Sequence, residues 1–217
     1  MDKLNGGFKF KLFSGLISVL FIAGALFFDN IFLYGTGGIF ILVFGMMIFF
    51  FRDPERIPPE GENVMVSPAD GKIISVSQEY ENTYLKENAT RVSIYLNLFN
   101  VHVSRIPLSG TIEFLEYKKG SFYPAFLNKA SERNERLAVG ITHGNLKFLL
   151  ILIAGTIARR IVYNVRTGDR VTTGDRFGFI KFGSRVELFV PERVKLNVSP
   201  GEKVKGALSI MSRLDEK

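Results

Sequence analysis

Two long uncharged runs, almost adjacent in the sequence, fill most of the first fifty residues. The first extends from Leu12 to Phe28 and the second from Ile31 to Phe51, with only Asp29-Asn30 between them. The second run has the length that an α-helix needs to cross a bilayer core, and the first is near the short limit. Because Asp-Asn favours a turn, residues 1–51 are predicted to form a membrane anchor of two hydrophobic helices, arranged as a spanning hairpin or a re-entrant pair.

Positive charges flank this predicted hairpin on both sides. They are Lys3, Lys9, Lys11, Arg52 and Arg56. By the positive-inside tendency, both ends of the hairpin and the chain that follows are expected on the cytoplasmic face of the cell membrane. A signal peptide is the alternative, because Ala23-Gly24-Ala25 loosely fits a cleavage site, but the second hydrophobic span would then remain.

The composition of the 217-residue chain excludes several kinds of site. Cysteine is absent, which excludes disulfides, thiolate metal sites and cysteine nucleophiles. Only two histidines are present, His102 and His143, so no metal site is expected. The net charge of +7 suits either nucleic acid or an anionic membrane surface, and the hydrophobic hairpin favours the membrane over nucleic acid.

Residues 52–62 are predicted to be a linker, because they contain three prolines and four acidic residues. From Asn63 onward, short apolar runs alternate with turn signals, which is typical of strands. The remaining residues, 63–217, are therefore expected to form a mainly β (α+β) domain of the barrel-sandwich type. Strands are predicted at Val64–Val66, Lys72–Ser77, Arg91–Phe99, Gly110–Tyr117, Asn145–Ala154, Thr156–Val165, Phe177–Phe182, Arg185–Val190 and Lys203–Ile210. One helix is expected near Ala125–Arg136.

A short turn motif occurs twice in this region. Gly168-Asp169-Arg170-Val171 and Gly201-Glu202-Lys203-Val204 share the pattern glycine, acid, basic residue, valine. Each motif is predicted to lead into a strand. Repeated turns of this kind suit a small barrel or sandwich built from hairpins.

Five segments carry motifs that are weak singly, since Asp-Gly and Gly-Ser are common turns. They are Phe50–Arg56, Ser67–Gly71, Asn100–Pro107, Arg133–Arg136 with Ile153–Arg160, and Phe177–Pro191, which contains Gly183-Ser184. Taken together and in this order, they resemble the phosphatidylserine decarboxylase proenzyme family. The resemblance is greatest to its short prokaryotic, archaetidylserine decarboxylase-like type.

This resemblance implies a carboxy-lyase that cuts itself between Gly183 and Ser184. The two products, residues 1–183 and 184–217, would remain together as a heterodimer. Ser184 would become a covalent pyruvoyl cofactor. The expected reaction converts phosphatidylserine, or an archaeal-type ether analogue, to the ethanolamine phospholipid and CO2.

The chemistry also follows from the substrate. Decarboxylation of an α-amino acid leaves electrons on the α-carbon, and a group conjugated to the amine must accept them. A serine can supply such a group. The Ser184 hydroxyl attacks the Gly183 carbonyl to form an ester, and β-elimination leaves dehydroalanine, which takes up water and loses ammonia to give pyruvoyl. The preceding glycine gives the backbone freedom for this attack.

The resemblance also assigns two helper residues. Asp70 matches the family's processing acid and would orient or accept the proton of Ser184, directly or through His102. His102 would transfer protons during self-cleavage and protonate the α-carbon after CO2 leaves. Some relatives have a second histidine where this chain has Arg105, which argues against a strict Asp-His-Ser triad. Either His102 has more than one role, or Asp70 acts alone. His143 is expected to be structural.

Three arginines are candidates for binding the lipid phosphate: Arg159, Arg160 and Arg136. Because side chains alternate along a strand, only one of Arg159 and Arg160 is expected to face the substrate. A solvated basic surface is the alternative interpretation. Lys118, Lys119 and Phe122 are expected at a rim that dips into the membrane interface.

Two other functions fit a membrane-anchored β domain. One is a non-enzymatic adaptor, which would have no reason to cut itself. The other is a lipoyl-like carrier, which needs an exposed lysine at a hairpin tip with acidic neighbours, and no such lysine stands out.

Overall fold

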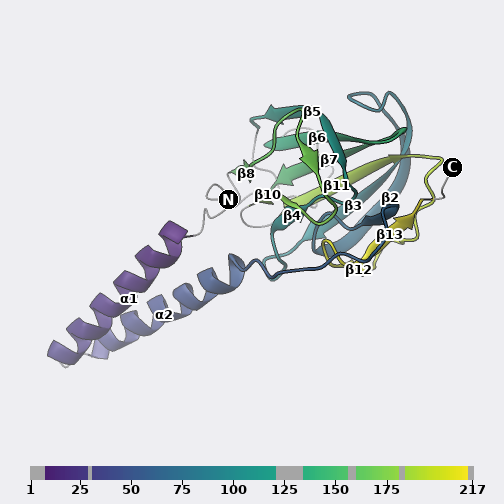
Figure 1. Cartoon of the computed structure of the whole chain (residues 1–217). Helices are drawn as coiled ribbons and strands as arrows, with labels where there is room; N and C mark the ends of the chain where they lie inside the picture. The colour runs from purple at the N-terminus through teal and green to yellow at the C-terminus, as the bar shows by residue number, and fades with distance from the viewer. Residues whose placement is uncertain (1–7, 29–30, 121–133, 156–159, 181–183, 215–217) are drawn as a thin grey trace. The chain divides into compact units, whose positions relative to one another are not determined.

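The computed structural model describes residues 8–28, 31–120, 134–155, 160–180 and 184–214. The chain divides into two compact units, Met1–Asp53 and Pro54–Lys217. The first unit is helical and the second is built from strands (Figure 1).

Two helices form the first unit, as predicted: α1 (Phe8–Phe28) and α2 (Ile31–Phe50). They lie side by side (Figure 1), and the Phe21 ring stacks on Phe40 with centroids 5.2 Å apart. Among the described residues, α2 is the one helix long and apolar enough to cross a membrane, with a mean hydropathy of 2.1. In α1 the apolar stretch is shorter, Leu12–Phe28.

The second unit is organised around one eight-stranded sheet, and all of its strand pairs are antiparallel. From edge to edge it contains β12 (Lys203–Val204), β2 (Gly71–Glu81), β3 (Glu87–Leu96), β11 (Ser184–Pro191), β7 (Leu146–Ala154), β6 (Arg136–His143), β5 (Gly110–Lys118) and β9 (Arg170–Val171). A three-stranded sheet contains β4 (Val103–Arg105), β10 (Arg176–Ile180) and β8 (Ile161–Tyr163), and a two-stranded sheet contains β1 (Val64–Val66) and β13 (Ile210–Arg213).

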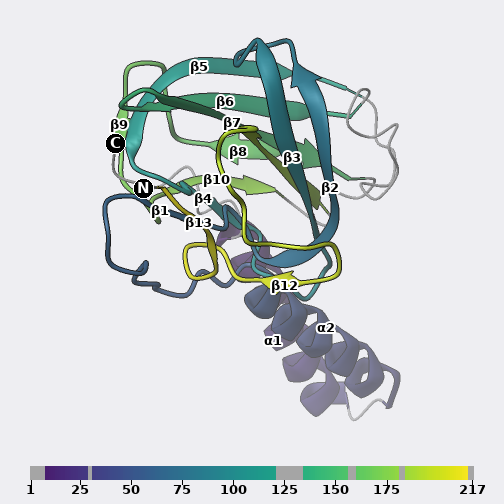
Figure 2. The same cartoon turned by 90° about the vertical axis from the view of Figure 1, so that its right-hand side faces the viewer.

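The large sheet curls over the two small ones (Figure 2), and the core lies between them. Alternate residues of β11 point into this core, namely Val186, Leu188 and Val190, all with no exposed surface. Phe177 and Met211 reach the same core from the small sheets. Burial of so many Val, Leu and Ile side chains is the main force that closes the half-barrel.

The two copies of the turn motif lie at opposite edges of the large sheet. One leads into β9 and the other into β12, which are the two edge strands. Gly168 and Gly201 have φ values of +93° and +97°, a conformation that favours glycine. Each motif therefore ends the sheet with a short strand, which limits the exposed edge.

The mainly β architecture confirms the prediction, but several element boundaries differ. The predicted strand Lys203–Ile210 is wrong: β12 ends at Val204, and a turn containing Ala207 at φ +62° precedes β13. Strand β3 ends at Leu96 rather than Phe99, and β6 was not predicted at all. Most of the helix expected near 125–136 falls outside the described residues, and Arg136 begins β6.

Candidate active site

Ser184 is the first described residue after the predicted cleavage position, and it begins β11. It pairs with Leu96 of β3 on one side and with Ala154 of β7 on the other. Its side chain has no exposed surface, and among the described residues its Oγ has no hydrogen-bond partner. A buried hydroxyl without a partner is unfavourable for folding, and such groups are frequent where a site needs a reactive atom. Gly183 lies outside the described residues.

His102 lies in the segment between β3 and β4 and is fully buried. Its carbonyl oxygen accepts a hydrogen bond from the Ile180 amide, 3.3 Å away, so His102 lies beside the end of the strand that leads towards Ser184. The ring Nδ1 is 2.9 Å from the Asn100 carbonyl oxygen. A carbonyl can only accept, so Nδ1 carries a proton in this contact and Nε2 is the basic nitrogen of the neutral ring.

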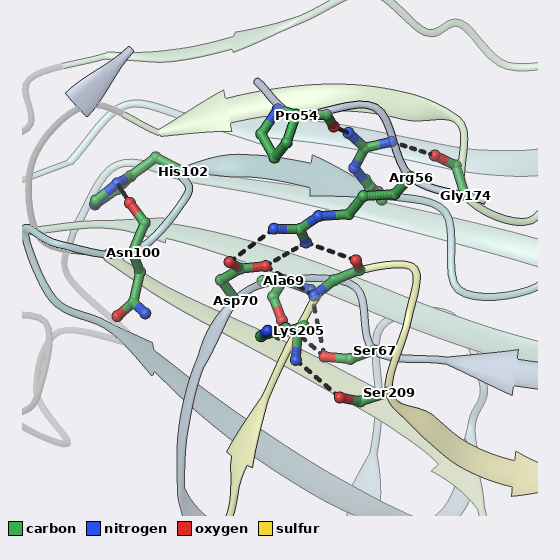
Figure 3. Close-up of polar contacts among 12 residues, drawn as sticks. Pro54, Arg56, Ser67, Ala69, Asp70, Asn100, His102, Gly174, Lys205 and Ser209 are labelled. Atoms are coloured by element: carbon green, nitrogen blue, oxygen red, sulfur yellow. Dashed lines mark hydrogen bonds and ion pairs between the residues drawn. The ribbon is translucent and has the colours of Figure 1, made fainter. Parts of the chain in front are cut away.

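Asp70 lies directly before Gly71, the first residue of β2. A Cβ at position 71 would be 2.3 Å from the Tyr95 carbonyl oxygen, so only glycine allows β2 to approach β3 this closely. The Asp70 carboxylate accepts hydrogen bonds from both terminal nitrogens of Arg56 and from the Gly206 amide (Figure 3). The partners of Asp70 in this structure are therefore an arginine and a backbone amide, and its predicted proton-accepting role stays a prediction.

The strand register brings these residues to one end of the large sheet. Leu96, Ser184 and Ala154 form one row, and the Ala154 amide donates to the Glu135 carbonyl at 3.0 Å. On the other side, Lys72 and Arg185 both pair with Tyr95, so Gly71 is level with Ser184 and Asp70 lies one residue beyond this row. With strands about 4.8 Å apart, Asp70 and Glu135 lie roughly 10 Å from Ser184, backbone to backbone, on either side.

A sequence profile of the family described as phosphatidylserine decarboxylase matches residues 43–212. The match covers nearly all of the strand-built unit, including Asp70, His102 and Ser184. The chain belongs to the phosphatidylserine decarboxylase family. An adaptor or carrier function is accordingly not supported.

Bacterial members of the family resemble the chain over most of its length. The phosphatidylserine decarboxylase proenzyme of Syntrophus aciditrophicus (strain SB) is 50% identical over 161 residues, which are 74% of this chain and 76% of that protein. The proenzyme of Carboxydothermus hydrogenoformans is 42% identical over 209 residues, 96% of this chain and 94% of its own. That of Chlorobium phaeobacteroides is 44% identical over 181 residues, covering 83% and 84%.

Two buried polar residues of this family member were not singled out from the sequence. The Asn134 side-chain amide donates to the Ala154 carbonyl at 2.7 Å, and the Glu135 carboxylate accepts from the Ile161 amide at 2.8 Å. They are only 2% and 5% exposed. Together they fix the end of β7 beside Ser184 and the start of β8. Both residues lie in the Arg133–Arg136 motif, which could have indicated them, but only Arg136 was considered as a site residue.

Glu135 also affects a neighbouring tyrosine. Burial is the main cause that raises the pKa of Tyr117 to about 12, and the hydrogen bond and charge of Glu135 add to it. Tyr117 also lies beside the Tyr163 ring, with centroids 6.1 Å apart. The Tyr117 ring of β5 thus contacts the end of β8.

Two of the three predicted phosphate-binding arginines, Arg136 and Arg160, are among the described residues. Arg159 lies outside the described residues, and Arg160 is exposed just before β8. Arg136 is half-buried and pairs with Ile153, the position that Arg185 also faces, so it lies one row away from Ser184 and on the opposite face of the sheet. Arg160 directly precedes β8 of the three-stranded sheet.

The remaining candidates have structural partners. Nδ1 of His143 is 2.8 Å from the Ser109 carbonyl oxygen and Nε2 is 3.3 Å from the Asn63 side chain, in keeping with the structural role expected for it. Lys118 forms an ion pair with Glu116, and Lys119 is exposed. Phe122 falls outside the described residues.

Proposed function

We propose that this chain cuts itself between Gly183 and Ser184 and then decarboxylates the serine headgroup of a phospholipid with the pyruvoyl group formed from Ser184. The substrate is phosphatidylserine or an ether-linked serine lipid of the archaeal type, and the reaction itself involves only the headgroup that the two share. The observation that carries the proposal is the buried Oγ of Ser184, which has no partner among the described residues at the first position of a central strand. Its reactive oxygen is therefore not engaged elsewhere.

The residues around position 184 fit a pyruvoyl group. Ser184 lies between Leu96 and Ala154, which are small or apolar and fully buried, so these described neighbours shield the start of β11 from water. Once formed, the group would supply an electron sink conjugated to the amine of the substrate. Such chemistry benefits from a dry site, because water would compete for the carbonyl.

The strand order supports a stable pair of fragments. All eight residues of β11 are buried, and they pair with β3 and β7 of the larger fragment. The smaller fragment also contributes β12, which pairs with β2, and β13, which pairs with β1. A cut before Ser184 would leave these pairings in place, so residues 1–183 and 184–217 would remain one folded heterodimer.

His102 and Asp70 are assigned the proton transfers. The Nδ1–H group of His102 donates to the Asn100 carbonyl, which orients the ring. Nε2 is then the base that would take the Ser184 proton and later protonate the α-carbon. Asp70 would assist the first of these steps. Asn134 and Glu135 would hold the opposite side of the site, with Arg160 as the described candidate for the lipid phosphate.

Membrane attachment through the two helices would bring the enzyme to its substrate. The apolar α2 ends at Phe50, and the Arg52 guanidinium donates to the Phe49 carbonyl at 2.7 Å and lies 3.8 Å over the Phe49 ring. A cation at this position is typical of a helix end at the membrane surface. The positive charges on both sides of the helices favour the cytoplasmic face.

The test is release of CO2 from vesicles that contain phosphatidylserine labelled in the serine carboxyl group. The full-length chain is expected to release label and to form the ethanolamine lipid, while Ser184→Ala releases none. Label release by Ser184→Ala equal to that of the wild type would remove Ser184 and the pyruvoyl group from the reaction. Arg160→Ala is expected to raise KM for the lipid, and an unchanged KM would exclude it from phosphate binding.

A further inference from the structure

Three segments far apart in the sequence meet at the Asp70 carboxylate. Arg56 comes from the linker after the helices, Asp70 from the turn before β2, and Gly206 from the segment after β12 (Figure 3). The two terminal nitrogens of Arg56 lie 2.5 and 2.9 Å from the two carboxylate oxygens, and one of them also lies 2.6 Å from the Gly206 carbonyl. The side chains of Arg56 and Asp70 are 8% and 12% exposed.

These bonds fix the orientation of the carboxylate and leave it one acceptor position. Oδ1 of Asp70 accepts from Arg56 and from the Gly206 amide, which is 2.8 Å away. Oδ2 accepts one bond, from Arg56. A carboxylate offers about four lone-pair positions, two on each oxygen, so one position on Oδ2 remains for a further proton donor. A bidentate arginine is the side chain best suited to set this geometry.

The Gly206 side of this arrangement is rigid. The Lys205 amide donates to the Ser209 hydroxyl and the Ala207 amide to the Ser67 carbonyl, both at 2.9 Å. A Cβ at position 206 would lie 3.2 Å from the Ala69 backbone, so glycine allows a close approach there. The Gly206 amide is therefore a fixed donor, and Arg56 supplies the side-chain donors that complete the carboxylate geometry.

The linker that carries Arg56 is attached at three consecutive residues. Arg105 donates to the Pro54 carbonyl at 2.9 Å, and Arg176 pairs with Glu55 at 2.8 Å. Arg105 follows His102 by three residues and is 3% exposed, while Arg176 begins β10, which leads towards Ser184. Each attachment thus ends on an element of the candidate site.

We propose that Arg56 is a positioning residue for self-cleavage, through which the linker at the membrane exit becomes part of the processing site. Its guanidinium fixes the Asp70 carboxylate. In this orientation the remaining lone pair of Oδ2 can accept a proton from His102 or Ser184. A chain whose linker is not docked would mature slowly. This inference rests on the proposed function, because it assigns Arg56 to the step that creates the pyruvoyl group.

The test follows maturation of the full-length chain after cell-free synthesis in the presence of phospholipid vesicles. Arg56→Gln removes both the positive charge and the paired hydrogen bonds of the guanidinium, whereas Arg56→Lys keeps only the charge. Arg56→Gln is expected to slow the appearance of the two fragments about tenfold or more, the loss expected for one charge-assisted hydrogen bond to the reacting groups. Arg56→Lys is expected to mature at an intermediate rate, and added guanidinium ion should partly restore Arg56→Gln.

Glu55→Gln is the matched control, because the Glu55 side chain is 90% exposed, so its ion pair with Arg176 adds little to linker docking and does not involve Asp70. It is expected to mature at the wild-type rate. The matured fraction of Arg56→Gln is expected to keep the wild-type turnover per pyruvoyl group, since Arg56 acts before that group exists. Turnover that falls as much as maturation, or release of the small fragment during gel filtration, would make Arg56 a structural clamp and overturn the proposal.

Maturation of Arg56→Gln at the wild-type rate would also overturn it. Failure of the proposed function has a different signature, since the wild-type chain itself would then remain uncut under the same conditions.

Discussion

Removal of the Ser184 hydroxyl should stabilise the uncut protein while it abolishes maturation. The side chain has no exposed surface, and its Oγ has no partner among the described residues. A buried hydroxyl that loses water without gaining a partner destabilises the folded state by about 1–3 kcal/mol. Ser184→Ala removes one oxygen and leaves no large cavity, so it should raise the free energy of unfolding by about this amount. For a unit of this size, the rise in Tm is on the order of 5 °C.

The comparison needs chains that stay uncut and differ at position 184 alone. Asp70→Asn supplies such a background, because its self-cleavage is expected to fail. The assay is urea unfolding of Asp70→Asn with and without Ser184→Ala, followed by intrinsic tyrosine fluorescence and far-UV circular dichroism. Ser104→Ala is the matched control, since Ser104 is equally buried and its Oγ also has no partner among the described residues.

Both serine substitutions are expected to raise the free energy of unfolding in this background. A decrease for Ser184→Ala together with an increase for Ser104→Ala would refute the reasoning about Ser184. It would mean that the hydroxyl makes a stabilising hydrogen bond, and that self-cleavage must first break it.

Three further predictions concern other residues. His102→Ala should keep the fold but lose most of its turnover per pyruvoyl group, and unchanged steady-state kinetics would remove His102 from the mechanism. In β11, Glu187→Leu in a Ser184→Ala chain should lower the free energy of unfolding in urea by about 3–5 kcal/mol, because Arg185 loses the buried carboxylate with which it pairs. The double substitution Arg185→Met with Glu187→Leu should be close to neutral, and equal losses in the two chains would contradict this. Burial raises the pKa of Tyr84 from 10.0 to about 12. The stability that the neutral Tyr84 contributes should therefore be fully present below pH 10 and be lost as the pH rises towards 12. Urea unfolding across that pH range should show a smaller loss of stability for Tyr84→Phe.

Local sequence patterns were sufficient where one segment determines the structure. The two uncharged runs became α1 and α2, and Gly168 and Gly201 became the turns that lead into edge strands. Strand β6 was missed because its residues from Leu137 to Ile141 are buried on both faces, so they show no alternation. The polar residues before it favoured a helix, and that prediction ran into Arg136, which begins β6.

The polar contacts of the site could not be predicted from sequence, because they join distant segments. Arg56 was counted as a charge flanking the membrane helices, yet it pairs with Asp70, 14 residues later. Gly206, 136 residues after Asp70, supplies the third donor. Glu135 was part of a recognised motif, but its burial depends on where β7 ends and β8 begins. Such pairings follow from tertiary packing and leave no periodic signal.

The intact mass of catalytically active protein tests the central claim most directly. The predicted result is two masses, for residues 1–183 and for residues 184–217, the smaller one lacking a free amino terminus and reacting with a carbonyl reagent such as phenylhydrazine. A single full-length mass with an unmodified serine at position 184, in material that releases CO2 from phosphatidylserine, would contradict it.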